Sequence, residues 1–253
     1  MRLVAALLLA MASISAAAEC TVHSGSRTNV LVELFTSEGC DSCPPADRWL
    51  SQLGRGTTAP DRVIPIAFHV DYWDYLGWKD RFADPRFTER QRALAAAASS
   101  TRVYTPQVMM AGRDFYRWRD DRLFARSLEE ASARAPRATI SITSSPPANG
   151  RLAASVATQL ASGEAARDLA TYFAVVESGH ASRVAAGENR GETLRHDHVV
   201  REFGVKPVPG GVFENVVSWP ADRDPSRSAL VAFVQNVRTG EVLQALRAPV
   251  CRP

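Results

Sequence analysis

A pair of cysteines with two residues between them, followed at once by two prolines, constrains this chain most. The run reads C-D-S-C-P-P and starts at Cys40. Proline lacks a backbone N–H, so within a helix it fits only the first turn. The apolar residues Ala46, Trp49 and Leu53 then recur at helical spacing. The pattern predicts a helix to about Leu53, with Cys40 and Cys43 at its N-terminal end.

A C-x-x-C pair alone is compatible with a redox dithiol, half of a metal site or a plain disulfide. A helix N-terminus stabilises a thiolate, because its free N–H groups and dipole favour negative charge. Zinc normally takes two further Cys or His ligands at matching spacing, and the other cysteines lie near the chain ends. Redox chemistry is therefore favoured. The carboxylate of Asp41 opposes a neighbouring thiolate, so we expect only weak activation of Cys40.

The first residues have the pattern of a secretory signal peptide. Arg2 supplies a positive charge, a short apolar stretch from Leu3 to Ala12 follows, and Ala16 to Ala18 form an A-x-A cleavage site. We expect residues 1–18 to be removed and the mature protein to be periplasmic or secreted. No later apolar run reaches membrane length, so no membrane insertion is expected after removal of the signal peptide.

Four cysteines in an exported chain favour disulfides. Three pairings are available to four cysteines. Cys40 and Cys43 are close enough in sequence to pair locally, which leaves Cys20 with Cys251. Since domain termini often lie close together, this second pairing is geometrically reasonable. We interpret Cys20 and Cys251 as a structural disulfide.

The first part of the mature chain, residues 19–136, alternates between strand and helix patterns. The order predicted from periodicity and turn residues is β-α-β-α-β-β-α. The expected strands are 29–35, 63–71, 103–110 and 114–118, and the expected helices are 44–53, 84–98 and 121–134.

The second part, residues 137–253, reads as consecutive strands. Paired prolines, Asn149–Gly150 and Thr239–Gly240 mark turns between them. The expected strands are 138–144, 151–160, 169–177, 213–219, 228–237 and 241–247. This spacing favours a sandwich-like domain.

The order of elements in the first part, with C-x-x-C directly after the first strand, resembles the thioredoxin fold. The resemblance implies an α/β thioredoxin-like domain followed by the β-rich domain. It also implies that Cys40 is the attacking nucleophile and Cys43 the resolving cysteine. Pro106, within Y-T-P-Q, matches a cis-proline that faces the dithiol, and the backbone of Thr105 would pair with a bound peptide. Glu33 falls near a buried acid that relays a proton to the second cysteine, although its register is shifted by one residue.

Two longer motifs resemble a narrower family. They are L-F-T-S-E-G-C-D-S-C-P-P-A-D and F-H-V-D-Y-W-D-Y-L-G-W-K-D. Together they are similar to the secreted family catalogued as domain-of-unknown-function family 1223. The resemblance spans most of the mature chain. It implies a thioredoxin-like domain and lends no settled activity.

Aromatic residues follow the second expected strand. Trp73, Tyr75 and Trp78 either line a substrate groove beside the dithiol or cover the end of that strand. His69 ends the same strand, where it is either a hydrogen-bonded core histidine or a ligand for a soft metal.

The sequence favours an exported thiol–disulfide oxidoreductase that acts on protein or small-molecule thiols and disulfides. No cofactor is expected, since the chain lacks nucleotide-binding glycine patterns, and no basic stripe indicates nucleic-acid binding. One alternative is a Cu(I)-binding module that uses Cys40, Cys43 and His69. The other is a non-catalytic interaction protein with a permanent disulfide. A trans Pro106 or a buried Cys40 sulfur would count against the enzyme.

Overall fold

The computed structural model describes residues 19–54, 62–208 and 211–252. The expected signal peptide lies outside the described residues. No helix in the described ranges is long and apolar enough to cross a membrane.

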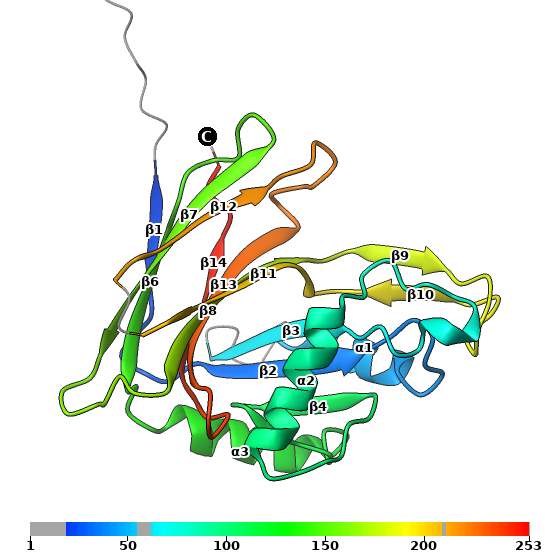
Figure 1. The fold of residues 1–253 in the computed structure, drawn as a ribbon, viewed down its shortest axis with the longest axis horizontal. Helices are drawn as coiled ribbons and strands as arrows, with labels where there is room; N and C mark the ends of the chain where they lie inside the picture. Colours follow the sequence, from blue (N-terminus) through cyan, green and yellow to red (C-terminus); the bar gives the residue numbers. More distant parts are fainter. Residues whose placement is uncertain (1–18, 55–61, 209–210, 253) are drawn as a thin grey trace, which may run out of the picture.

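Three sheets, three α-helices and one short 3-10 helix make up the described part of the chain (Figure 1). The strands are β1 (Cys20–His23), β2 (Val30–Thr36), β3 (Val63–His69), β4 (Gln107–Met110), β5 (Arg113–Asp114), β6 (Ala138–Ser144), β7 (Arg151–Leu160), β8 (Leu169–Glu177), β9 (His180–Arg183), β10 (Thr193–His196), β11 (Val199–Pro207), β12 (Phe213–Ser218), β13 (Ser228–Asn236) and β14 (Val242–Pro249). The helices are α1 (Pro44–Gln52), η1 (Asp74–Leu76), α2 (Pro85–Ala97) and α3 (Asp121–Ser132).

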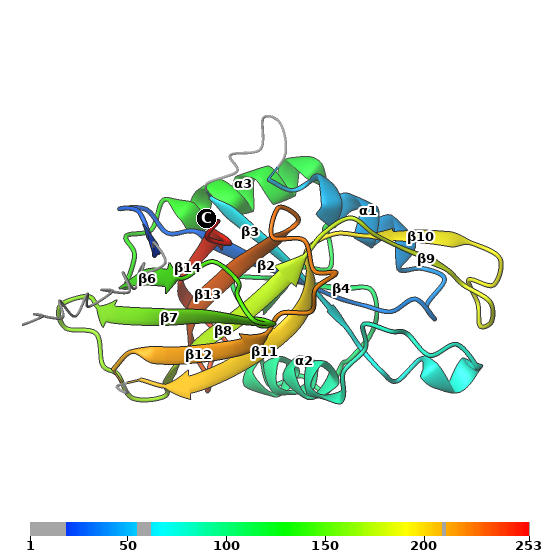
Figure 2. The same cartoon turned by 90° about the horizontal axis from the view of Figure 1, so that it is seen from above.

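The largest sheet has eight strands in the order β14-β13-β8-β11-β3-β2-β4-β5. Its central strands β2 and β3 are parallel and buried along their whole length. This burial on both faces explains why their sequences are nearly continuous apolar runs rather than alternating ones. The helices cover both faces, with α1 and α3 on one side and α2 on the other (Figure 2).

The expected fold class, an α/β thioredoxin-like domain followed by a separate sandwich-like domain, is wrong. The described chain is β-rich, and its eight-stranded sheet contains strands from both sides of residue 136. Strand β11 joins the halves, because it pairs with β8 on one side and with β3 on the other. The backbone N–H of Ala67 in β3 donates to the carbonyl oxygen of His198, just before β11, at 2.8 Å.

A second sheet packs on one end of the large one. Its order is β1-β6-β7-β12, and its inner face includes Ile140, Leu152 and Val156. These side chains meet Phe173 and Leu230 of the large sheet in one apolar cluster. A two-stranded hairpin of β9 and β10 projects from the other end, beside α1 (Figures 1 and 2).

A disulfide links the first strand to the segment after the last one. Cys20 and Cys251 form a disulfide with Cα atoms 5.5 Å apart, across a sequence separation of 231 residues. This is the pairing that the sequence favours. Because β1 is an edge strand paired only with β6, the disulfide ties this edge to the segment after β14.

Candidate functional site

The C-x-x-C motif lies between the end of β2 and the start of α1. The N–H of Cys40 donates to the carbonyl oxygen of Ser37, and the N–H of Cys43 to that of Cys40, both at 3.2 Å. Cys43 is the N-cap of α1, and the two prolines occupy its first turn, where no N–H is needed. Cys40 and Cys43 form a disulfide with Cα atoms 5.5 Å apart.

Both cysteines are buried, although the two residues between them are exposed. Cys40 and Cys43 have no exposed surface, while Asp41 and Ser42 face solvent. The Ser42 hydroxyl lies 3.4 Å from the sulfur of Cys40. The burial of Cys40 counts against direct attack by a bulky partner in this closed arrangement.

The loop between β9 and β10 is the cover over the cysteine turn. Asn189 in this loop is buried, and its Nδ2 donates to the carbonyl oxygens of Glu38 and Cys40, both at 2.9 Å. The N–H of Asp41 donates to Glu188 Oε2 at 3.1 Å. The loop is therefore attached to the cysteine turn by three hydrogen bonds, two of which come from a single side chain.

The aromatic segment after β3 forms the neighbouring wall. A Cβ atom at Gly39 would lie 2.9 Å from Trp73 Cβ, so only glycine allows this close approach. The indole N–H of Trp73 donates to Thr105 Oγ1 at 2.8 Å, and the peptide bond between Thr105 and Pro106 is cis. Thr105 is therefore linked through Trp73 to the residue before Cys40.

The other two aromatic candidates differ from each other. Trp78 is half-buried, and its Nε1 donates to Glu38 Oε2 at 2.8 Å. Tyr75, in η1, is 78% exposed. Trp78 therefore helps to build the wall beside the cysteine turn, whereas Tyr75 lies on the surface.

Buried acids and histidines gather behind the cysteine turn. His69 Nδ1 lies 2.6 Å from Asp80 Oδ2, and the same oxygen accepts the N–H of Glu38 at 2.9 Å. His196, at the end of β10, places Nε2 3.2 Å from Glu38 Oε1, without the alignment of a hydrogen bond. The rings of His69 and His196 meet edge to face, with centroids 4.9 Å apart.

For both His69 and Asp80, burial shifts the pKa in one direction and their pairing shifts it in the other. Burial alone would lower the pKa of His69, but the charge and hydrogen bond of Asp80 outweigh it and raise that pKa. Burial opposes ionisation of Asp80, yet His69 and two backbone N–H groups hold its pKa below the usual value. The pair is therefore stabilised as an imidazolium and a carboxylate.

Asp47 is the buried acid on the helix that Cys43 begins. It lies four residues after Cys43, on the buried face of α1 that also carries Ala46 and Leu50. Helical side chains lean towards the N-terminus, so the carboxyl group of Asp47 extends towards the turn that contains Cys43. Its Oδ2 has no hydrogen-bond partner among the described residues, and burial raises the pKa of Asp47.

Glu33 is not brought to the cysteines. It lies on the same face of β2 as Leu31 and Phe35, which pack against α2, whereas α1 packs on the opposite face. Its carboxylate pairs with Arg90 of α2 at 2.6 Å, and both side chains are buried. Burial raises the pKa of Glu33, and Arg90 opposes that rise. The position of Glu33 fits a structural ion pair.

His69 is a hydrogen-bonded core histidine through its Nδ1 atom. Within residues 19–54, 62–208 and 211–252, no group of three or more His, Cys, Asp or Glu side chains is arranged to hold a metal ion. Sequence reasoning missed Glu38, Asp47, Asp80 and Asn189 as neighbours of the cysteines. Asp47 alone had a usable signal, since it is an acid on the apolar face of the helix that Cys43 begins.

Comparison with solved structures finds three similar proteins, of which the first two share this fold. A structural-genomics protein from Agrobacterium tumefaciens is 25% identical, with a TM-score of 0.58, and the match covers 88% of this chain and 95% of that one. HBP35 of Porphyromonas gingivalis is 13% identical, with a TM-score of 0.65 and coverage of 90% and 76%. A domain of the outer membrane lipoprotein Omp28 from the same organism is more distant, with a TM-score of 0.34, 14% identity and coverage of 46% and 88%.

The sequence itself matches a protein family over most of its length. No curated protein is significantly similar to the chain. The family described as "Protein of unknown function (DUF1223)" matches residues 31–235, a range that includes the cysteine turn, the aromatic wall and the loop that covers them. The chain therefore belongs to the DUF1223 family.

Proposed function

We propose that this protein is an exported thiol–disulfide oxidoreductase whose reactive group is the Cys40–Cys43 disulfide. The observation that carries the proposal is the position of this disulfide at a helix N-terminus, between Glu38 and Asp47, which belong to a buried group of acids and histidines. A disulfide that serves only as a cross-link has no need of titratable neighbours. Export is supported by the pairing of all four cysteines, because stable disulfides belong to oxidising compartments.

The exchange proceeds in two balanced steps. A substrate thiolate attacks Cys40 Sγ, which forms a mixed disulfide and breaks the bond to Cys43. Cys43 leaves as a thiolate and takes up a proton. A second substrate thiolate then attacks the substrate sulfur of the mixed disulfide, which releases an oxidised substrate and the Cys40 thiolate. Two electrons pass from the substrate thiols to the protein, and the reverse sequence reduces a substrate disulfide.

Asp47 is suited to supply the proton that Cys43 takes up. A buried carboxyl with a raised pKa holds its proton to higher pH than an exposed one. Its Oδ2 makes no well-aligned hydrogen bond with a described residue, although Thr36, His69 and His196 oppose the rise of its pKa. Asp47 therefore acts as a proton donor to the resolving cysteine, a role that the sequence assigned to Glu33.

Reaction requires the cover over Cys40 to move. Asn189 and Glu188 belong to the loop between two short strands, and residues 185 and 190–193 around them are exposed. Loss of the three hydrogen bonds that attach this loop would uncover the turn without breaking the eight-stranded sheet. The loop is thereby a gate for substrate access in the proposed enzyme.

The proposal is tested by trapping the first intermediate. The reduced Cys43→Ala variant is mixed with glutathione disulfide and examined by mass spectrometry. Cys40 should retain one glutathione, because no resolving thiol remains to expel it. The matched control is Cys40→Ala, which keeps Cys43 alone and should react far more slowly, because the proposal assigns the exchange with substrate to Cys40.

Two outcomes would contradict the enzyme. Absence of an adduct on Cys40 would favour an interaction protein with a permanent disulfide. If Cys43 in the Cys40→Ala variant is labelled as fast as Cys40 in the Cys43→Ala variant, the two cysteines do not have separate roles as nucleophile and resolving cysteine. Stoichiometric Cu(I) binding by the reduced protein that is lost in His69→Ala would favour the metal-binding alternative instead.

A further inference from the structure

A second site lies at the opposite end of β2 from the cysteines. A pocket with a volume of about 950 Å³ opens beside Asn29, just before β2 begins, whereas the cysteine turn follows the end of this strand. Seven strand residues separate the two sites, which corresponds to roughly 20 Å. The pocket is also lined by the start of β13, the end of β14 and the segment after β1.

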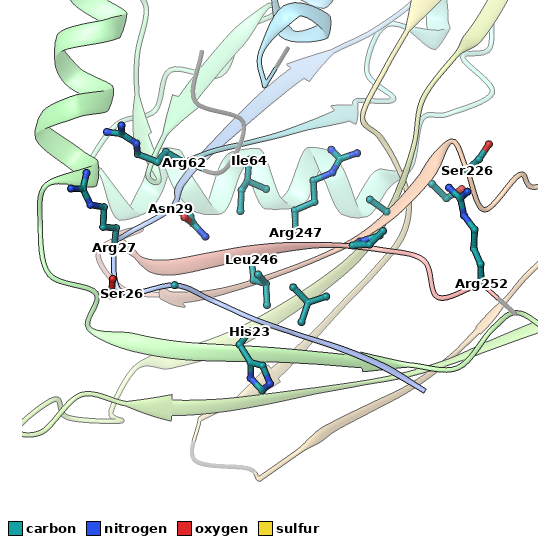
Figure 3. A pocket seen from close by; sticks show the side chains of 15 residues that line it. His23, Ser26, Arg27, Asn29, Arg62, Ile64, Ser226, Leu246, Arg247 and Arg252 are labelled. Atoms are coloured by element: carbon teal, nitrogen blue, oxygen red, sulfur yellow. The ribbon is translucent and has the colours of Figure 1, made fainter. Parts of the chain in front are cut away.

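The charged side chains that line this pocket are all basic. Figure 3 shows Arg27 and Arg62 at one side, Arg247 near the centre and Arg252 at the other side. His23 adds a further nitrogen-bearing group. None of the described lining residues is Asp or Glu. The positive charges are spread across the pocket rather than gathered at one point.

Arg247 gives the strongest indication of a ligand. It lies in the edge strand β14, and burial lowers the pKa of its guanidinium group. Its Nη1 lies 3.1 Å from His198 Nδ1, and no carboxylate of the described residues forms an ion pair with it. Arg247 is half-buried. A partly buried guanidinium without a counter-charge is costly, so an anion in the pocket would relieve a cost that this chain otherwise bears.

The neighbouring arginines are only weakly neutralised. Arg62 pairs with Glu129 at 2.9 Å, but the Glu129 side chain is 69% exposed. Arg252 interacts through its charge with the exposed Asp224, which is also 3.7 Å from Arg227. Exposed pairs contribute little energy and are screened by salt, so these two arginines stay available to an anion.

We propose that this pocket binds an elongated organic anion that carries two or more phosphate or carboxylate groups. Guanidinium groups form paired hydrogen bonds with the oxygens of either group, which suits arginine better than lysine for this task. A single small anion reaches only one part of a pocket of this volume, whereas a ligand with separated charges contacts Arg247 together with Arg27 or Arg252. The site is independent of the proposed chemistry at Cys40.

Isothermal titration of the intact, oxidised protein tests this proposal. The probes are inorganic triphosphate, citrate and inorganic phosphate. We expect saturable binding of triphosphate or citrate at least tenfold tighter than that of phosphate, and the tighter probe identifies the preferred charged group. Affinity should fall at least tenfold in Arg247→Gln and several-fold in Arg27→Gln and Arg252→Gln.

The controls separate a built site from general charge attraction. Arg183→Gln removes an exposed arginine of β9 and should bind as the wild type does. Cys40→Ser/Cys43→Ser should also retain binding, so failure of the proposed enzyme would leave this result intact. Absence of saturable binding, or equal affinity in Arg247→Gln and Arg183→Gln, would overturn the proposal. If Arg247→Gln does not fold, unchanged affinity in both Arg27→Gln and Arg252→Gln would overturn it as well.

Discussion

The two disulfides of this protein join cysteines with equal Cα separations in different surroundings. Each pair has Cα atoms 5.5 Å apart. Cys20 and Cys251 are 231 residues apart in sequence, and the described residues around them include no cluster of buried acids and histidines. Cys40 and Cys43 enclose only two residues, but they lie before a helix and in front of buried Asp47, Glu38 and His69.

The difference between the two disulfides indicates that they have different roles. A cross-link stabilises mainly by restricting the unfolded chain, and this effect grows with the length of the enclosed loop. By that measure Cys20–Cys251 is the stabilising bond, and Cys40–Cys43 gives little. The cost of burying acids and histidines beside the shorter disulfide is therefore better explained by chemistry than by stability.

The largest expected effect is the loss of the long-range disulfide. Cys20→Ser/Cys251→Ser should lower the free energy of unfolding by about 2–5 kcal/mol, because the unfolded chain regains the freedom that the bond removes. Urea unfolding followed by circular dichroism measures it. The matched variant Cys40→Ser/Cys43→Ser should lose less, and a larger loss there would reverse the proposed division of roles.

The next effect concerns proton supply to Cys43. Asp47→Asn should slow reduction of the Cys40–Cys43 disulfide by dithiothreitol at least about tenfold, since the leaving thiolate loses its proton donor. The ratio of wild-type to variant rate should fall as the pH rises through the raised pKa of Asp47. Stopped-flow kinetics at several pH values provides this ratio.

Glu33→Gln is the control for Asp47→Asn, because Glu33 is also a buried carboxyl group near the cysteines in sequence. It should destabilise the protein by leaving Arg90 unpaired, yet the reduction rate should be unchanged. A slow Glu33→Gln variant together with a normal Asp47→Asn variant would restore the role that the sequence assigned to Glu33.

A smaller effect on the reduction rate is expected from changes in the loop between β9 and β10. Asn189→Ala removes the hydrogen bonds to Glu38 and Cys40, so the loop should open more often and dithiothreitol should reduce the disulfide several-fold faster. Arg190→Ala changes the adjacent exposed residue and should leave the rate unaltered. An unchanged rate in Asn189→Ala would mean that this loop does not control access.

The smallest expected effect is the pH dependence contributed by His69 and Asp80. The folded-state pKa of His69 is raised, so the stability that it adds is fully present below pH of about 6.5 and is lost as the pH rises through that raised value. Urea unfolding of the wild type should show this decline, and His69→Gln should not. Parallel declines in both proteins would contradict the paired state of His69.

Local features of this fold could be predicted from sequence. Two prolines and apolar spacing place the start of α1, and the six strands expected after residue 137 are β6, β7, β8, β12, β13 and β14, with small shifts at some ends. These elements have strong local patterns. Strand β11 does not, because its residues after Val200 are only partly buried and do not alternate.

Missing β11 is what led to the wrong fold class. Without this strand the chain divides into two apparent domains, and with it one sheet continues through both. The same limit applies to the site. Asn189 contacts Cys40 across 149 residues, through a hairpin whose short strands are half exposed, so no local pattern could place it.

The reduction potential of Cys40–Cys43 decides whether this disulfide is reactive or a permanent cross-link. The protein is equilibrated with glutathione or dithiothreitol redox buffers, alkylated and analysed by mass spectrometry, so that each disulfide is followed separately. We expect a potential above about −300 mV for Cys40–Cys43 and a lower one for Cys20–Cys251. A Cys40–Cys43 potential far below −300 mV, as resistant to reduction as the long-range disulfide, would contradict it.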